Sequence, residues 1–254
     1  MLFWTKNRLL KYLLDEKNKE LWNEVNSIYN IKLKRYKGYI YASGISQKRA
    51  KIYIPNKNIS SSLFTHELLH LKLNASNLHI GFYLFKLCEN DDVLSCIFNY
   101  QNSMVIGNLL EHEFTYKQFI ALGYKEDEFV CDYNTDKFTD KDKELIKNST
   151  GIDYDCIYFF ISKYIVLKTI RESNRDYSDA LMYMHSVNID LFFIADQFYQ
   201  KIKELFQLPV QDAEIMIIST INNLLEMLRG YFLKKISIEL NRIENSYHKN
   251  NNIV

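Results

Sequence analysis

The feature that most limits what this chain can fold into is its scarcity of helix-breaking residues. Only two prolines and seven glycines occur among 254 residues, so few positions force a turn. Apolar residues recur at helical spacing over residues 6–29, 103–121 and most of 154–247, which predicts amphipathic helices. We therefore expect a predominantly helical α+β fold, in which a helical region over 151–254 packs on a first domain over 1–150.

Two short runs interrupt the helical pattern in the first half of the chain. Residues 38–42 and 51–54 are rich in tyrosine and isoleucine, and a polar loop containing Gly44 separates them. Such residues favour strands, so the pair predicts a short antiparallel sheet. Pro55 ends the second run, and a serine within 60–62 is expected to cap the helix that follows.

That next helix carries the most informative motif, H-E-x-x-H, formed by His66, Glu67 and His70. Residues four positions apart lie on one face of a helix, so both imidazoles can bind one zinc ion. Glu67 then lies beside the water on that ion. Four leucines between residues 68 and 73 predict a buried helix, in which histidine and glutamate need polar partners.

The order of these elements resembles that of the zincin metallopeptidases over about residues 35–125: a helix, antiparallel strands, and a helix with H-E-x-x-H. The resemblance implies that His66 and His70 are zinc ligands and that Glu67 is the general base. It also implies that a sheet edge near the motif helix pairs with an extended substrate, and residues 51–54 are the candidate strand. The third histidine that follows the motif in metzincins is missing here.

A catalytic zinc ion needs a third protein ligand, and two adjacent residues compete for this role. Glu111 matches the later glutamate of the gluzincin branch. Helical periodicity instead places His112 at the centre of an apolar stripe over residues 105–119, so both remain candidates. Other downstream candidates are His79, Glu89, Asp91, Asp92 and Glu113. Tyrosines near enough in sequence to donate a hydrogen bond to the transition state are Tyr116, Tyr124 and Tyr133.

Charge, apolar runs and cysteine spacing limit the partners and the compartment that we expect for this protein. The 32 basic and 31 acidic residues give a net charge of +1, which argues against a broad nucleic-acid-binding face. The most apolar run, 157–167, is interrupted by Lys163 and is too short to cross a bilayer. The four cysteines form no C-x-x-C pair and suggest reduced thiols. The charged stretch 125–147 predicts a solvated loop and a surface helix capped at Thr139. We expect a cytoplasmic protein without nucleic-acid or membrane partners.

The sequence therefore predicts a zinc metallopeptidase with one Zn²⁺ per chain and a peptide or protein as its substrate. The first alternative is a zincin-like metal-binding protein that senses a signal or binds a partner without significant proteolysis. This alternative is based on the large helical C-terminal region, which could mediate homo-oligomer formation or bind a protein partner. The second alternative is a helical protein in which the motif is coincidental.

Overall fold

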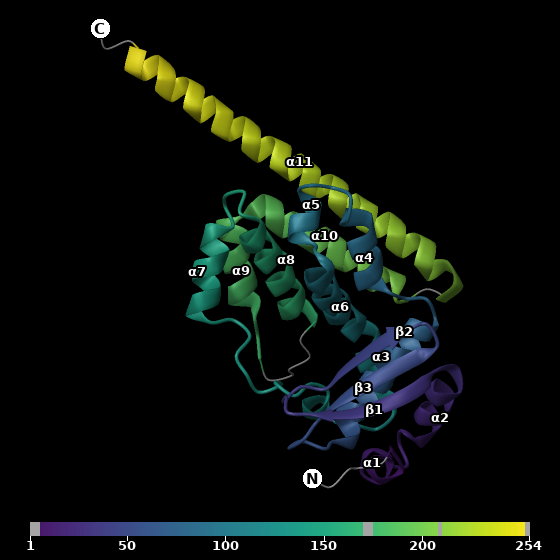
Figure 1. Ribbon diagram of the computed structural model, residues 1–254. Coiled ribbons are helices and arrows are strands. Elements are labelled where there is room, and N and C mark those ends of the chain that lie inside the picture. The colour runs from purple at the N-terminus through teal and green to yellow at the C-terminus, as the bar shows by residue number, and fades with distance from the viewer. Residues whose placement is uncertain (1–5, 170–174, 208–209, 252–254) are drawn as a thin grey trace. The chain divides into compact units, whose positions relative to one another are not determined.

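The computed structural model describes residues 6–169, 175–207 and 210–251 (Figure 1). Helices dominate these residues and one small sheet accompanies them, which confirms the predominantly helical α+β class. The described residues form two compact units. Unit 1 comprises those within Met1–His79, Glu111–Asp136 and Arg171–Arg175, and unit 2 those within Ile80–Leu110, Lys137–Ile170 and Asp176–Val254. The units are groups of residues in contact, and the division into domains at residue 150 stays a prediction.

Unit 1 contains a three-stranded mixed sheet. Its elements begin with α1 (Lys6–Leu13), α2 (Lys19–Ile28), β1 (Asn30–Tyr36), β2 (Ala42–Ser46) and β3 (Arg49–Pro55). β3 is the central strand, parallel to β1 and antiparallel to β2. An antiparallel pair is therefore present, but its first strand is Ala42–Ser46 and not residues 38–42, and Gly44, expected in the loop, lies within β2.

The strand β1 lay outside the prediction, although its sequence carries a signal. Lys32 and Lys34 alternate with Ile31 and Leu33, and Ile31 is 2% exposed. Such alternation is typical of a strand with one buried face. Because β1 and β2 occupy both edges of β3, residues 51–54 cannot pair with a substrate. That expectation was wrong, and the edge strand antiparallel to β3 is β2.

The motif helix α3 (Ser61–Ala75) packs against the sheet and forms the centre of unit 1 (Figure 1). Ser60 caps it as predicted, since the Ser60 side chain accepts a hydrogen bond from the Leu63 N–H at 3.2 Å. Phe64 and Leu68 are fully buried. Their neighbours in the core include Trp22, Ile52, Ile54, Leu69 and Phe119.

A buried polar network fixes the start of α3 against the turn between α1 and α2. Asn18 is fully buried, and its amide donates to the Leu13 carbonyl and to the hydroxyls of Ser61 and Thr65. The Tyr124 hydroxyl donates to the Asp15 carboxylate at 2.8 Å. These bonds satisfy the polar groups at this helix end, so α3 has a defined position in unit 1.

Unit 2 is helical in its described residues. It contains α4 (Ile80–Cys88), α5 (Leu94–Ile97), the first half of α6 (Tyr100–Ala121), α7 (Asp140–Asn148), α8 (Tyr154–Thr169), α9 (Ser178–Val187), α10 (Ile189–Leu205) and α11 (Val210–Asn251). Its core includes Phe160, Tyr164, Phe198, Ile221 and Leu228. The start of α11 expected at Pro209 lies outside the described residues. No described helix is both long and apolar enough to cross a membrane.

Glycines allow a close approach of α4 and α6 within unit 2. A Cβ atom on Gly107 would lie 2.4 Å from the Gly81 nitrogen and 2.6 Å from its Cα. We expect Gly107→Ala to lower the free energy of unfolding by about 1–3 kcal/mol, because backbone must move. The matched control is Gly230→Ala in α11, where an added Cβ meets nothing within 4 Å. Chemical denaturation should show this control unchanged or slightly stabilised, and equal effects of the two changes would contradict the prediction.

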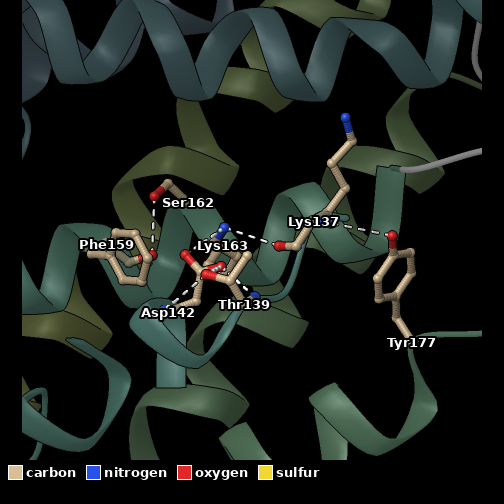
Figure 2. Close-up of polar contacts among 7 residues, drawn as sticks. All are labelled: Lys137, Thr139, Asp142, Phe159, Ser162, Lys163 and Tyr177. Carbon is tan, nitrogen blue, oxygen red and sulfur yellow. Dashed lines mark hydrogen bonds and ion pairs between the residues drawn. The ribbon is translucent and has the colours of Figure 1, made fainter. Parts of the chain in front are cut away.

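The lysine that interrupts the apolar run of α8 has a partner from α7 (Figure 2). Lys163 Nζ lies 2.9 Å from the Asp142 carboxylate, and the two side chains are 16% and 14% exposed. Lys163 also donates to the Lys137 carbonyl at 3.0 Å, and the Thr139 N–H donates to Asp142 at 2.7 Å. Thr139 caps α7 as predicted. The ion pair and cap therefore join α7 to α8.

This pair predicts a pH-dependent contribution to stability. Burial alone would raise the pKa of Asp142, but bonds from Thr139 and Lys163 outweigh it and the pKa is lowered. The stabilisation is thus present above the unfolded-state pKa and is lost as the pH falls through the folded-state pKa. We expect Asp142→Asn to cost about 1–3 kcal/mol at pH 7, and the deficit should shrink below about pH 4.

Denaturant titrations of the wild type and Asp142→Asn across pH would measure this deficit. The control is Asp140→Asn, which removes a carboxylate that is 96% exposed and paired with Lys143. Exposed pairs contribute little, so the stability of this variant should equal that of the wild type within the error of the titration. A deficit of Asp142→Asn that stays constant from pH 7 to pH 2 would exclude an ionic origin.

Candidate metal centre

Three histidines from two helices of unit 1 meet in the structure. His66 and His70 lie one turn apart on α3, and their Nε2 atoms are 3.1 Å apart. His112 comes from α6, and one nitrogen of each ring lies within 4.8 Å of the other two. Ligands on one tetrahedral zinc ion are about 3.4 Å apart, as Zn–N bonds of 2.0–2.1 Å require. This group could therefore bind a metal ion after small adjustments of the rings.

The cluster is buried and contains nitrogens that lack partners. His66 and His70 are 8% and 5% exposed, and His112 is partly buried. Among the described residues, His66 Nδ1 and His112 Nε2 are buried without a hydrogen-bond partner. Buried polar atoms without partners are uncommon because they are costly. A cation would give the lone pair of His112 Nε2 such a partner, and His66 would offer the ion its Nε2, which lies next to His70 Nε2, so the three rings fit a metal.

The two candidates for the third ligand, Glu111 and His112, have different contacts in the structure. His112 belongs to the three-histidine group, whereas Glu111 Oε2 lies 2.8 Å from His70 Nδ1. Glu111 is 8% exposed. A carboxylate that accepts the Nδ1–H of a histidine fixes the ring and leaves Nε2 available for a metal. The geometry therefore offers His112 as a ligand and Glu111 as the residue that orients His70.

Glu67, the middle residue of the motif, is also buried, with 7% of its surface exposed. Burial raises the pKa of its carboxyl group, while the charge of His70 and a hydrogen bond from Ser43 oppose this shift. Ser43 lies on β2. The sequence alone does not indicate Ser43, because only the fold shows which residue of the strand lies next to Glu67.

The protonation of the histidines differs with their surroundings. Burial, followed by the charges of His70 and His112, lowers the pKa of His66 well below its usual value. The Phe129 backbone opposes this shift, but His66 Nδ1 completes no hydrogen bond with it. Burial and the charge of His70 lower the pKa of His112 to about 3. Both rings are therefore neutral at pH 7, which is the form that binds metals.

His70 behaves differently because a carboxylate contacts it. Burial alone would lower its pKa, but the hydrogen bond and charge of Glu111, together with the charge of Glu67, raise it. The Glu111 carboxylate lies next to Nδ1 of His70 and favours a proton on that nitrogen. A metal at Nε2 requires only that this second nitrogen be free of a proton.

An aromatic residue covers part of the cluster. The ring centroid of Phe129 lies 4.6 Å from that of His66 and 5.2 Å from that of His112. Tyr116 also contacts Phe129, at a centroid distance of 5.3 Å. Phe129 lies in the charged stretch 125–147, whose composition predicts a solvated loop, so the sequence did not indicate its burial.

The remaining sequence candidates have other partners or positions. His79 hydrogen-bonds to Asn74, Glu89 pairs with Lys86, and Asp91 pairs with Arg229. Asp92 belongs to unit 2 with Glu89 and Asp91, and Glu113 is buried on α6. Among the tyrosines, Tyr124 donates to Asp15, and burial raises its pKa to about 12. Tyr116 adjoins the cluster through Phe129.

Comparisons with family models, with curated proteins and with solved structures gave no match to this chain. Any functional interpretation therefore rests on the motif and on the geometry of unit 1.

Proposed function

We propose that the protein is a zinc-dependent peptidase of the zincin type, with one zinc ion held by His66, His70 and His112. The observation that carries this proposal is the proximity of three imidazole nitrogens, with the buried carboxylate of Glu67 on the same helix. Imidazole ligands suit zinc, copper, iron and nickel. Three protein ligands and a position open to water are typical of catalytic zinc, and H-E-x-x-H supplies the base.

The residues of the chain have separate roles in this proposal. Bound zinc supplies a Lewis acid that activates water near neutral pH. Glu67 accepts a proton from the attacking water and returns it to the leaving amine. The raised pKa of its carboxyl group brings it closer to the working pH. Glu111 orients His70, and Ser43 holds Glu67 by a hydrogen bond.

The proposed substrate is an extended peptide or protein segment. β2 is an edge strand and carries Ser43, the hydrogen-bond partner of Glu67. An exposed strand edge can pair with a peptide through main-chain hydrogen bonds. We therefore propose β2, in place of residues 51–54, as the strand that lines the substrate. All four cysteines are free, which suits the reducing cytoplasm that we propose as its location.

Metal analysis tests the proposal directly. Protein purified without chelator is expected to contain about one zinc ion per chain by elemental analysis, because a three-histidine site retains zinc. The double variant His66→Ala/His70→Ala is expected to lose it. Zinc-free wild-type protein, or equal zinc in the double variant, would refute the proposed site.

The second candidate is a metal-binding sensor or partner-binding protein without significant proteolysis. One observation favours it: large apolar side chains are exposed on α11, with Leu233 70% and Leu240 57% exposed. Exposed apolar residues on one element are typical of an interaction surface. A peptide library incubated with the zinc-loaded protein separates the two functions. Cleavage that a chelator abolishes supports the peptidase, and intact peptides support the partner-binding protein.

A further inference from the structure

Phe129 is a buried aromatic residue of unit 1 that lies outside the helices and strands, as Tyr41 and Tyr124 also do. It directly follows the short 3₁₀ helix η1 (Glu126–Glu128), in which no residue is buried. Its own side chain is only 6% exposed. Phe119, by comparison, is buried on the long helix α6. Phe129 therefore places an apolar ring into the molecule from an exposed turn.

The hydrogen bonds that shape this turn are local. The Lys125 N–H donates to the Glu128 carboxylate at 2.9 Å, and the Phe129 N–H donates to the Glu126 carbonyl at 3.1 Å. Before the turn, Tyr124 is fixed by Asp15. Its ring also stacks on Phe119, with centroids 4.9 Å apart. The turn thus begins at a fixed residue, Tyr124, and contains two hydrogen bonds between residues close in sequence.

The chain after the turn is also held by a hydrogen bond. Arg175 donates to the Asn134 carbonyl at 2.7 Å. A short segment held at both ends can move its centre by rotating a few backbone angles, while the scaffold stays in place. The ring of Phe129 is the part of this segment that contacts the histidines.

We propose that Phe129 is a cover on the histidine cluster, and that solvent or substrate must displace it to reach His66 and His112. The ring contacts the two histidines whose partnerless nitrogens are buried. An apolar cover excludes water, which strengthens electrostatic interactions inside a site. The claim that a peptide substrate displaces Phe129 rests on the proposed function. The claim that Phe129 covers the histidines does not, because it needs no bound metal.

Chemical modification of the metal-free protein tests the cover. Diethyl pyrocarbonate carbethoxylates accessible neutral imidazoles, and peptide mass spectrometry locates the product. The exposed His185 on α9 provides an internal reference. In the wild type, His66 and His112 are expected to react at least about 10-fold more slowly than His185, because reaction requires local opening. In Phe129→Ala this difference should fall to about 3-fold or less.

Two further variants separate a cover from general loss of stability. Phe129→Leu keeps apolar volume and should give an intermediate rate. Phe119→Leu truncates a neighbour that contacts Phe129 but has no ring contact with the histidines, and its rate should stay near the wild-type value. Thermal unfolding checks that all variants are folded. Unchanged rates in Phe129→Ala, or equal acceleration in Phe119→Leu, would overturn the proposal.

A second measurement uses the zinc-loaded protein. Release of zinc to a coloured chelator is expected to be at least about 10-fold faster in Phe129→Ala than in the wild type, at the same zinc content. Equal release rates would count against the cover. If the wild type holds no zinc, the proposed function fails, while the modification experiment still decides whether Phe129 covers the histidines.

Discussion

Glu67→Gln is expected to slow peptide hydrolysis by orders of magnitude while the protein keeps its zinc. The carboxylate is the proposed proton acceptor, and glutamine has nearly the same shape but cannot take the proton. General-base catalysis typically contributes about 10²–10⁴-fold to a rate, so kcat should fall by that factor. Glu67 is not a ligand in the proposed site, so elemental analysis should still find about one zinc ion per chain.

The control for this variant is Glu24→Gln. Glu24 on α2 forms an ion pair of 2.8 Å with Lys72, which lies on the exposed side of α3. Glu24 lies outside the three-histidine group. Loss of an exposed pair has little effect, so its activity should equal that of the wild type. Retained hydrolysis in Glu67→Gln would remove the general-base role. Zinc lost together with activity would instead indicate that Glu67 supports the metal site.

The position of the motif helix could be predicted from the sequence because its signals are local. Serine before the helix satisfies free N–H groups, and leucines on most sides predict burial. The distance between His66 and His70 follows from the helical repeat alone. These features depend on neighbours in sequence, and the structure has Ser60 as the cap and both histidines buried.

Residues brought in by other elements could not be predicted in the same way. Glu111 and His112 are adjacent on α6, so they point about 100° apart, and the packing of α6 on α3 decides which of them meets the cluster. β1 is different, because the alternation of Ile31 and Leu33 with lysines is a local strand signal that the prediction did not use. Phe129 lies among charged residues whose composition indicates solvent exposure, and only tertiary contacts place its ring on His66.

The expected effects of His112→Ala and Glu111→Gln distinguish a ligand from a residue that orients one. His112 is the proposed third ligand, and its removal leaves two histidines on one turn, which hold zinc weakly. We expect His112→Ala to lose zinc during dialysis and to show no hydrolysis. Glu111 contacts the other nitrogen of His70. Removing such a partner typically lowers metal affinity about 10–100-fold, so Glu111→Gln should still bind one zinc ion when zinc is in excess.

Competition with a chelator of known affinity would measure both effects, and His79→Ala is the matched control. His79 hydrogen-bonds to Asn74 and is outside the three-histidine group, so its replacement should leave zinc affinity unchanged. The opposite order of effects, with zinc lost from Glu111→Gln and retained by His112→Ala, would make Glu111 the third ligand. His70 would then need to turn so that Glu111 reaches the metal, because in this structure the Glu111 carboxylate lies 2.8 Å from His70 Nδ1. Equal losses in both variants would mean that the fixed orientation of the His70 ring is as necessary for zinc binding as the third ligand itself.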